Sequence, residues 1–259
     1  MGLSLSSLSI DKQIEQRIYF PPKINKELYQ TLTSTRSMLL NYQTKTGKNI
    51  TAVQIRPTNN TFPEKYIVFS HGNGSDIYTM FQYLLYLSDE LNVGIIGYDY
   101  VGYGLSENIQ PSEQDCYDSI EATVDFLLTN WKMDPKKIFL VGQSLGTGIT
   151  VDYASKHKWD TPIILISPYK SICKVVKDTF LTAPIDKFKS QKKLKYVTCP
   201  VKIFHGTADE IIKINHGIEM YDSLKNKTLE PVWFCGIDHH NILDVISKEH
   251  YLQVLNYNA

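Results

Sequence analysis

A serine flanked by two glycines is the arrangement in this chain with the most distinct chemistry. The segment Gly-Gln-Ser-Leu-Gly at 142–146 follows an apolar run at 137–141 and precedes a helix-like stretch. In such a strand–turn–helix, the glycines leave room for a sharp turn that exposes the serine at a helix N-terminus. Backbone amides there favour developing negative charge. The arrangement predicts Ser144 as the nucleophile of an acyl-transfer reaction.

A serine hydroxyl is inert near neutral pH unless a base takes its proton and a carboxylate orients that base. Two later apolar runs end in groups of this kind. Asp209 and Glu210 follow the first run, and the adjacent His239 and His240 follow the second. This is the order, serine then acid then histidine, that nucleophiles in such turns use. We predict Asp209 as the orienting acid, with Glu210 as the alternative, and the residues alone leave the base open between the two histidines.

Two backbone amides are also needed to hold the negative oxygen that forms during acyl transfer. One belongs to the residue after the nucleophile, Leu145. The second should come from a glycine-containing loop, His-Gly-Asn-Gly-Ser-Asp, that follows an earlier apolar run. We predict the amide of Asn73, with Gly74 as the alternative. His71 and His205 each precede a glycine at a strand end, and we expect them to hold loops by hydrogen bonds.

Apolar patterning predicts the elements that position these groups. Strands are expected at 38–44, 50–56, 66–70, 94–99, 137–141, 162–166, 200–205 and 231–235. Helices are expected at 77–91, 113–131, 146–157, 214–224 and 241–255. Alternation from residue 66 onward is typical of parallel strands with helical crossovers, while the first two strands form a hairpin that turns at 47–49. The predicted fold class is α/β: a mainly parallel eight-stranded sheet with antiparallel strands at one edge and helices on both faces.

Two segments interrupt this regular pattern. Residues 1–37 are polar and predict a peripheral N-terminal arm on a domain that spans 38–259. The connection at about 169–195 is long for a compact domain, and such loops are often lids. It holds apolar side chains at 175–181 and a lysine run at 187–195. We expect a cap-like insertion there, with its lysines forming a solvated helix face.

Composition excludes several classes of protein. The 259 residues are 42% hydrophobic and 21% charged, as in one ordinary globular domain. Lys+Arg and Asp+Glu are both 27, so no basic excess favours nucleic acid. The four cysteines are far apart, which predicts neither a metal site nor a disulfide framework. With no signal peptide and no apolar run of about 20 residues, we expect a cytoplasmic monomer without metal or organic cofactor.

Six segments between about residue 66 and residue 245 together resemble a known family: HGNGSD, YDYVGYGLSE, GQSLGTG, SPYKS, HGTADEII and GIDHHN. They are similar to the α/β-hydrolase-domain serine hydrolases whose animal members remove palmitate from membrane proteins. The resemblance implies the α/β-hydrolase fold, with Ser144 and Asp209 as catalytic residues. It also implies His239 as the base, since the family's histidine stands three residues after a glycine, here Gly236. The segment at 98–104 matches a family signature, which we expect to shape the pocket wall.

The N-terminus is similar to the family in one respect and differs in another. Residues 2–6 and 19–22 resemble the start of those depalmitoylases, but the cysteine cluster that anchors them is absent, because no cysteine precedes Cys116. The first six residues fit the M-G-x-x-x-[ST] pattern for N-myristoylation at Gly2. One myristoyl chain binds membranes weakly, so a second element such as the lysine run would be needed. Myristoylation would bring the protein into peripheral contact with the cytosolic face of membranes, and an unmodified polar arm on a cytoplasmic protein is the alternative.

Together these features predict two-step hydrolysis of acyl esters or thioesters through an acyl-enzyme. The resemblance implies that the substrates are palmitoylated proteins. A lysophospholipase or small carboxylesterase would use the same residues, and peptidases share the fold, since a fold does not define a function. A catalytically silent binding module is the alternative from a different class.

Overall fold

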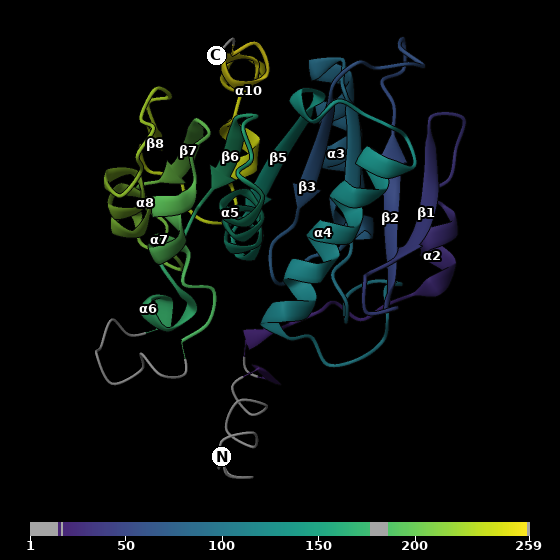
Figure 1. Cartoon of the computed structure of the whole chain (residues 1–259), viewed down its shortest axis with the longest axis horizontal. Coiled ribbons are helices and arrows are strands. Elements are labelled where there is room, and N and C mark those ends of the chain that lie inside the picture. Colours follow the sequence, from purple (N-terminus) through teal and green to yellow (C-terminus); the bar gives the residue numbers. More distant parts are fainter. Residues whose placement is uncertain (1–14, 17, 177–185, 258–259) are drawn as a thin grey trace.

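The computed structural model describes residues 15–16, 18–176 and 186–257, which form one eight-stranded sheet with helices on both faces (Figure 1). Strand order is β1-β2-β4-β3-β5-β6-β7-β8. All neighbours from β4 to β8 are parallel, whereas β2 is antiparallel to both β1 and β4. The strands are β1 Ser37–Gln43, β2 Asn49–Ile55, β3 Tyr66–Ser70, β4 Gly94–Tyr98, β5 Ile138–Gln143, β6 Ile163–Ile166, β7 Val201–Gly206 and β8 Val232–Phe234. The predicted fold class is confirmed.

The helices form two layers because successive residues of each strand point to opposite faces. In β5, Ile138 and Leu140 pack in one core with α4 and α5, while Phe139 and Val141 pack in the other with α3 and α10. Figure 1 shows α4 in front of the sheet. The helices are α2 Lys26–Gln30, α3 Ile77–Leu91, α4 Glu113–Thr129, α5 Leu145–His157, α6 Ile172–Val176, α7 Ser190–Lys193, α8 Ile214–Asp222, α9 Ile242–Val245 and α10 Lys248–Leu255, with 3₁₀ turns at Pro135–Lys137 and Leu194–Tyr196.

The helix predicted over 241–255 is wrong as a single element. It is divided into α9 and α10, because Ile246 has extended backbone (φ −77°, ψ 103°). Ser247 begins the second helix, and its backbone N–H donates to Nδ1 of His250 (3.1 Å). Serine competes well for local hydrogen bonds at a helix start, and this effect outweighs the apolar periodicity that runs through the segment.

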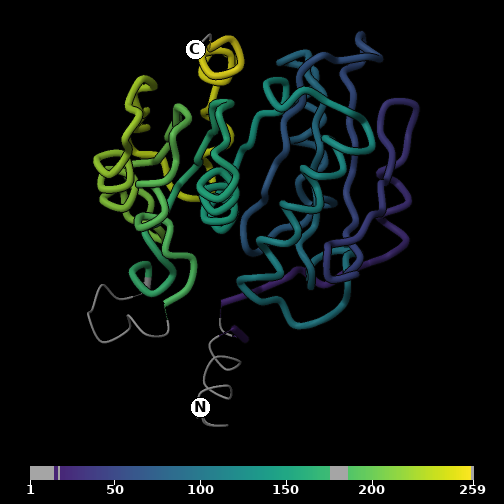
Figure 2. Tube along the Cα trace, viewed as in Figure 1, coloured from purple at the N-terminus to yellow at the C-terminus, as the bar shows by residue number. Residues whose placement is uncertain are grey.

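The described part of the N-terminal segment lies against the body of the protein. Ile18, Tyr19, Tyr29 and Leu32 are all buried. Figure 2 shows the chain running from the end of the molecule near α6 across to α2, beside β1. A few well-spaced apolar side chains therefore anchor a segment whose overall composition is polar.

The connection between β6 and β7 holds α6 and α7. Of the apolar residues predicted there, Phe180 and Leu181 lie outside the described residues. Part of the lysine run is engaged with acidic side chains. Lys193 donates to Asp152 (2.6 Å), and Lys187 lies 3.4 Å from Glu15.

Candidate active site

The turn between β5 and α5 holds Ser144 in a backbone conformation that side-chain-bearing residues rarely adopt (φ 50°, ψ −117°). The glycines on either side are required by close backbone approaches. A Cβ on Gly142 would lie 2.4 Å from the carbonyl oxygen of Gly146, and one on Gly146 would lie 2.0 Å from that of Ser70. Helix α5 can therefore pack directly against the end of β3, which places Ser144 at the carboxyl end of the sheet.

Gly146→Ala is expected to lower the melting temperature by several degrees, because overpacking of this kind costs about 1–3 kcal/mol. An alanine inside a helix is normally more favourable than glycine, so a loss of stability reports the contact with Ser70. Gly74→Ala is the control, since a Cβ there meets no atom within 4 Å. Equal melting temperatures for the two variants, measured by circular dichroism, would show that α5 and β3 can separate without cost.

Side chains from two later loops meet Ser144. His239, in the loop after β8, places Nε2 3.1 Å from Oγ of Ser144. Its Nδ1 lies 2.7 Å from Oδ2 of Asp209, in the loop after β7. Gly206, at the end of β7, allows the two loops to pack closely, since a Cβ there would lie only 2.1 Å from the carbonyl oxygen of Ile237. The structure thus brings together the three residues predicted from three separate segments.

The charge state of Asp209 determines the tautomer of His239. Burial raises the pKa of the Asp209 carboxyl, but contacts with His205 and His239 and the Ile212 amide outweigh it, so the pKa lies well below its ordinary value. An ionised carboxylate can only accept hydrogen bonds. Nδ1 of His239 therefore carries the proton, and its Nε2 is left to accept the Ser144 hydroxyl proton. This is the arrangement a general base requires.

The residues named as alternatives take other positions. Glu210 is exposed to solvent. The ring of His240 lies 6.0 Å from that of His239 and perpendicular to it. Asp238 forms the local turn, since its Oδ1 accepts the backbone N–H groups of His240 and Asn241 (both 2.9 Å).

The two buried histidines at strand ends hold loops, as expected. Nδ1 of His71 donates to the carbonyl oxygen of Gly72 (2.8 Å). Nε2 of His205 donates to the carbonyl oxygen of Ile212 (2.7 Å) and lies 3.5 Å from Asp209 Oδ2. His205 therefore supports the loop that carries Asp209.

A cavity of about 410 Å³ opens at Ser144. Asn73, Gly74 and Leu145, whose amides were considered for holding the negative oxygen, all line it. Much of the remaining wall is apolar, with contributions from Met80, Tyr169, Ile172, Val175, Ile211 and Ile212. Val175 comes from the apolar stretch predicted at 175–181. The site therefore places Ser144 beside a pocket suited to a hydrophobic group.

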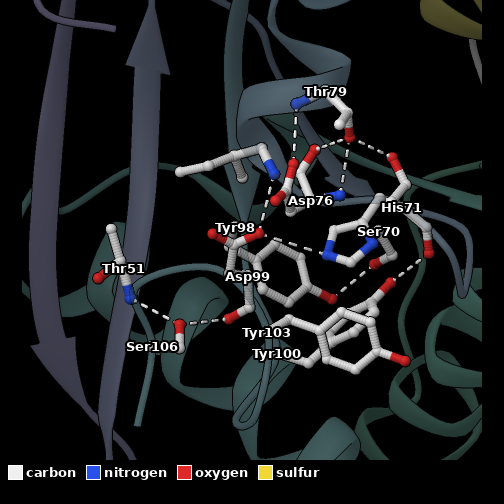
Figure 3. A network of polar contacts seen from close by, with 12 residues as sticks. Thr51, Ser70, His71, Asp76, Thr79, Tyr98, Asp99, Tyr100, Tyr103 and Ser106 are labelled. Atoms are coloured by element: carbon white, nitrogen blue, oxygen red, sulfur yellow. Dashed lines mark hydrogen bonds and ion pairs between the residues drawn. The ribbon is translucent and has the colours of Figure 1, made fainter. Parts of the chain in front are cut away.

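Residues 98–104 have a structural role and shape the pocket wall indirectly. None of them lines the cavity, but Tyr98, Asp99, Tyr100 and Tyr103 lie beside the loop after β3 that does (Figure 3). Tyr100 donates its hydroxyl to the carbonyl oxygen of His71 (2.6 Å). Oδ1 of Asp99 accepts the N–H of Ile77 (2.8 Å) and lies 3.5 Å from Nε2 of His71. Burial raises the pKa of Asp99, which His71 and the Ile77 amide only partly offset. Through Tyr100 and Asp99, residues 98–104 therefore support the loop after β3 from the side of the protein core.

Three features of the chain concern metal ions, cysteines and membranes. In the described ranges, no group of three or more His, Cys, Asp or Glu side chains could hold a metal ion. Two of the four cysteines, Cys116 and Cys199, are buried. No helix within residues 15–16, 18–176 and 186–257 combines the length and apolar character needed to cross a bilayer.

Comparisons with known proteins agree with this fold. The family model described as "Serine aminopeptidase, S33" matches residues 61–188. A protein of Acanthamoeba polyphaga mimivirus, whose name assigns it to the alpha/beta hydrolases, is 55% identical over 99% of both chains. The chain belongs to the α/β-hydrolase family.

A second relative and a solved structure are less similar to this chain. The "Alpha/beta hydrolase domain-containing protein 17C" of Xenopus tropicalis is 41% identical over 68% of this chain. That match spans only 56% of the frog protein's length. The crystal structure of an alpha-beta hydrolase from Vibrio vulnificus superposes with a TM-score of 0.75 at 16% identity, covering 99% of this chain and 95% of that one. This last likeness shows the fold alone.

Proposed function

We propose that this protein is a serine hydrolase that cleaves acyl thioesters or esters, with palmitoylated proteins as its substrates. One observation carries the proposal. Oγ of Ser144, the imidazole of His239 and the carboxylate of Asp209 form a continuous chain of contacts of 3.1 and 2.7 Å, and the first two residues line a largely apolar cavity.

The proposed reaction has two steps. Oγ of Ser144 attacks the carbonyl carbon while its proton passes to Nε2 of His239. The amides of Leu145 and Asn73 hold the resulting negative oxygen. His239 then protonates the departing thiol or alcohol, which leaves the acyl group on Ser144. In the second step His239 takes a proton from water, the hydroxide adds to the acyl-enzyme, and the carboxylic acid leaves as the proton returns to Ser144.

The choice of substrate rests on the cavity wall and on family resemblance. Ile172 and Val175 come from the cap-like connection, and Ile211 and Ile212 from the loop that carries Asp209. An apolar pocket of this kind favours burial of an alkyl chain. The resemblance to enzymes that remove palmitate from proteins favours a thioester on cysteine, with S-acylated proteins as partners.

A side-by-side comparison of substrates tests this choice. We expect kcat/KM for an S-palmitoylated peptide to exceed that for a lysophospholipid, a short-chain p-nitrophenyl ester and an aminoacyl p-nitroanilide by at least about tenfold. Faster turnover of the lysophospholipid or the short ester would instead identify a lysophospholipase or carboxylesterase. Preference for the anilide would identify a peptidase.

We further propose that Gly2 is myristoylated and that this places the enzyme at the cytosolic face of membranes. The support is the N-terminal sequence pattern. Gly2→Ala is expected to shift the protein from the membrane fraction to the supernatant when it is expressed in cells that carry N-myristoyltransferase. Leu3→Ala, which keeps the glycine, is the control. An unchanged membrane fraction for Gly2→Ala would contradict the proposal.

A further inference from the structure

The side chain of Asn73 forms hydrogen bonds with two backbone groups of the N-terminal segment and with Tyr103, and we call these three contacts the clasp. Oδ1 of Asn73 accepts the backbone N–H of Phe20 (3.0 Å), and its Nδ2 donates to the carbonyl oxygen of Ile18 (2.5 Å). The same Oδ1 accepts the hydroxyl of Tyr103 (2.6 Å). One side chain therefore joins three parts of the molecule: the N-terminal segment, the loop after β3, and the loop after β4.

The same residue lines the cavity beside Ser144. Its neighbour Gly72 is close enough that an added Cβ would lie 3.7 Å from Cβ of Ser144. An amide that stabilises a negative oxygen must lie about 2.7–3.1 Å from it. A displacement of about 1 Å can slow a reaction about 100-fold. The orientation of this loop is therefore critical for the proposed chemistry.

The N-terminal segment is itself firmly held. Ile18 is 8% exposed and Tyr19 4% exposed, and the ring of Tyr19 makes an edge contact with that of Phe188 (6.4 Å). Phe20, by contrast, is 61% exposed, so its contribution comes from the backbone N–H rather than from its side chain. The buried side chains of Ile18 and Tyr19 thus fix the Ile18 carbonyl and the Phe20 N–H against Asn73.

We propose that residues 18–20 are part of the active-site machinery, and that they position the oxyanion-binding loop through the side chain of Asn73. Asn73 has two roles: its amide binds the oxyanion, and its side chain sets where that amide lies. Displacement of the N-terminal segment would break its two hydrogen bonds to the Asn73 side chain. Turnover would then fall although no residue that touches the substrate has changed. This inference rests on the proposed function.

Two substitutions break the clasp from opposite sides. Asn73→Ala removes all three side-chain contacts but keeps the amide. Phe20→Pro removes the N–H that donates to Asn73, and Phe20→Ala is its comparison because it keeps that N–H. Asn226→Ala is the control for an asparagine far from the cavity, because Asn226 also bridges backbone groups, at Thr198 and Thr228.

Turnover and oxyanion binding are measured on the full chain with a soluble ester and an alkyl trifluoromethyl ketone. Ser144 adds reversibly to the ketone, and the oxygen of the adduct occupies the oxyanion position. We expect kcat to fall about 10- to 100-fold for Asn73→Ala, with KM within about twofold. We expect kcat for Phe20→Pro to be at least about fivefold below that for Phe20→Ala. Affinity for the ketone should fall by the same factors, and the double variant should be little worse than Asn73→Ala.

A purely structural clasp would lower the melting temperature and leave kcat and ketone affinity of the folded protein unchanged. The inference is overturned if kcat for Asn73→Ala stays within about threefold of that for Asn226→Ala. Multiplying effects of the Phe20→Pro and Asn73→Ala substitutions would also overturn it, since the two would then act separately. Failure of the wild type itself to hydrolyse any ester or bind the ketone would instead contradict the proposed function.

Discussion

Ser144→Ala is expected to lower kcat/KM for ester and thioester substrates by about 10⁴- to 10⁶-fold. The substitution removes the only atom that the mechanism bonds to the acyl group. The cavity and the amides of Leu145 and Asn73 remain, so the variant should still hydrolyse the substrate somewhat faster than water alone does. Labelling by a fluorophosphonate, which forms a covalent bond with an activated serine, should be lost completely.

Ser155→Ala provides the matched control for this experiment. Ser155 lies on the same helix, where its hydroxyl donates to the carbonyl oxygen of Asp152 (2.8 Å) at the end remote from the cavity. Both variants should show the circular dichroism spectrum of the wild type. If Ser144→Ala retained labelling at the wild-type rate, another nucleophile would be responsible, and the proposed mechanism would be wrong.

Asp209→Asn is expected to lower kcat by about 10⁴-fold while leaving the fold intact. In the wild type, the Asp209 carboxylate accepts a hydrogen bond from Nδ1 of His239 and so directs the lone pair of Nε2 toward Ser144. An amide can present its NH₂ group instead, which favours the opposite tautomer and leaves Nε2 protonated. Single-turnover kinetics with a p-nitrophenyl ester would measure the effect on acylation directly.

Asp238→Asn is the matched control, because Asp238 is a half-buried turn former in the same loop as His239. We expect its kcat to stay within about threefold of the wild type. Similar losses for the two variants would mean that the effect comes from the loop conformation and not from the contact with Nδ1.

Asp209→Asn should also change how stability depends on pH. Because the pKa of Asp209 is lower in the folded state than its ordinary value of about 3.9, its ionised form stabilises the fold above that pH. This contribution is lost as the pH falls below 3.9 toward the folded pKa. The amide does not titrate, so the variant should lose less of its free energy of unfolding between pH 7 and pH 3 than the wild type loses. Urea denaturation at the two pH values measures the difference.

Much of the fold could be predicted because its determinants are local. Each of the eight strands lies within two residues of its predicted position, since apolar runs flanked by turn residues specify buried strands. Ser144 could be predicted as the nucleophile because the sharp turn between β5 and α5 needs glycines at fixed spacing on either side of the serine. Asp209 could be chosen because functional side chains collect just after the parallel strands. Such signals occupy only a few consecutive residues.

Only the tertiary structure decided the direction in which side chains point and the contacts between residues far apart in the sequence. His239 and His240 are neighbours with the same chemistry, and only the packing of the two loops turns the first toward Ser144 and Asp209. The tyrosines at 98–104 could as well have lined the pocket as supported it from behind, because burial looks alike in both places. The contact of Asn73 with Phe20 joins residues 53 positions apart, and no local pattern encodes it. The sequence by itself determined the proposed nucleophile and the elements that present it, whereas the orientation of the groups around it follows from long-range packing.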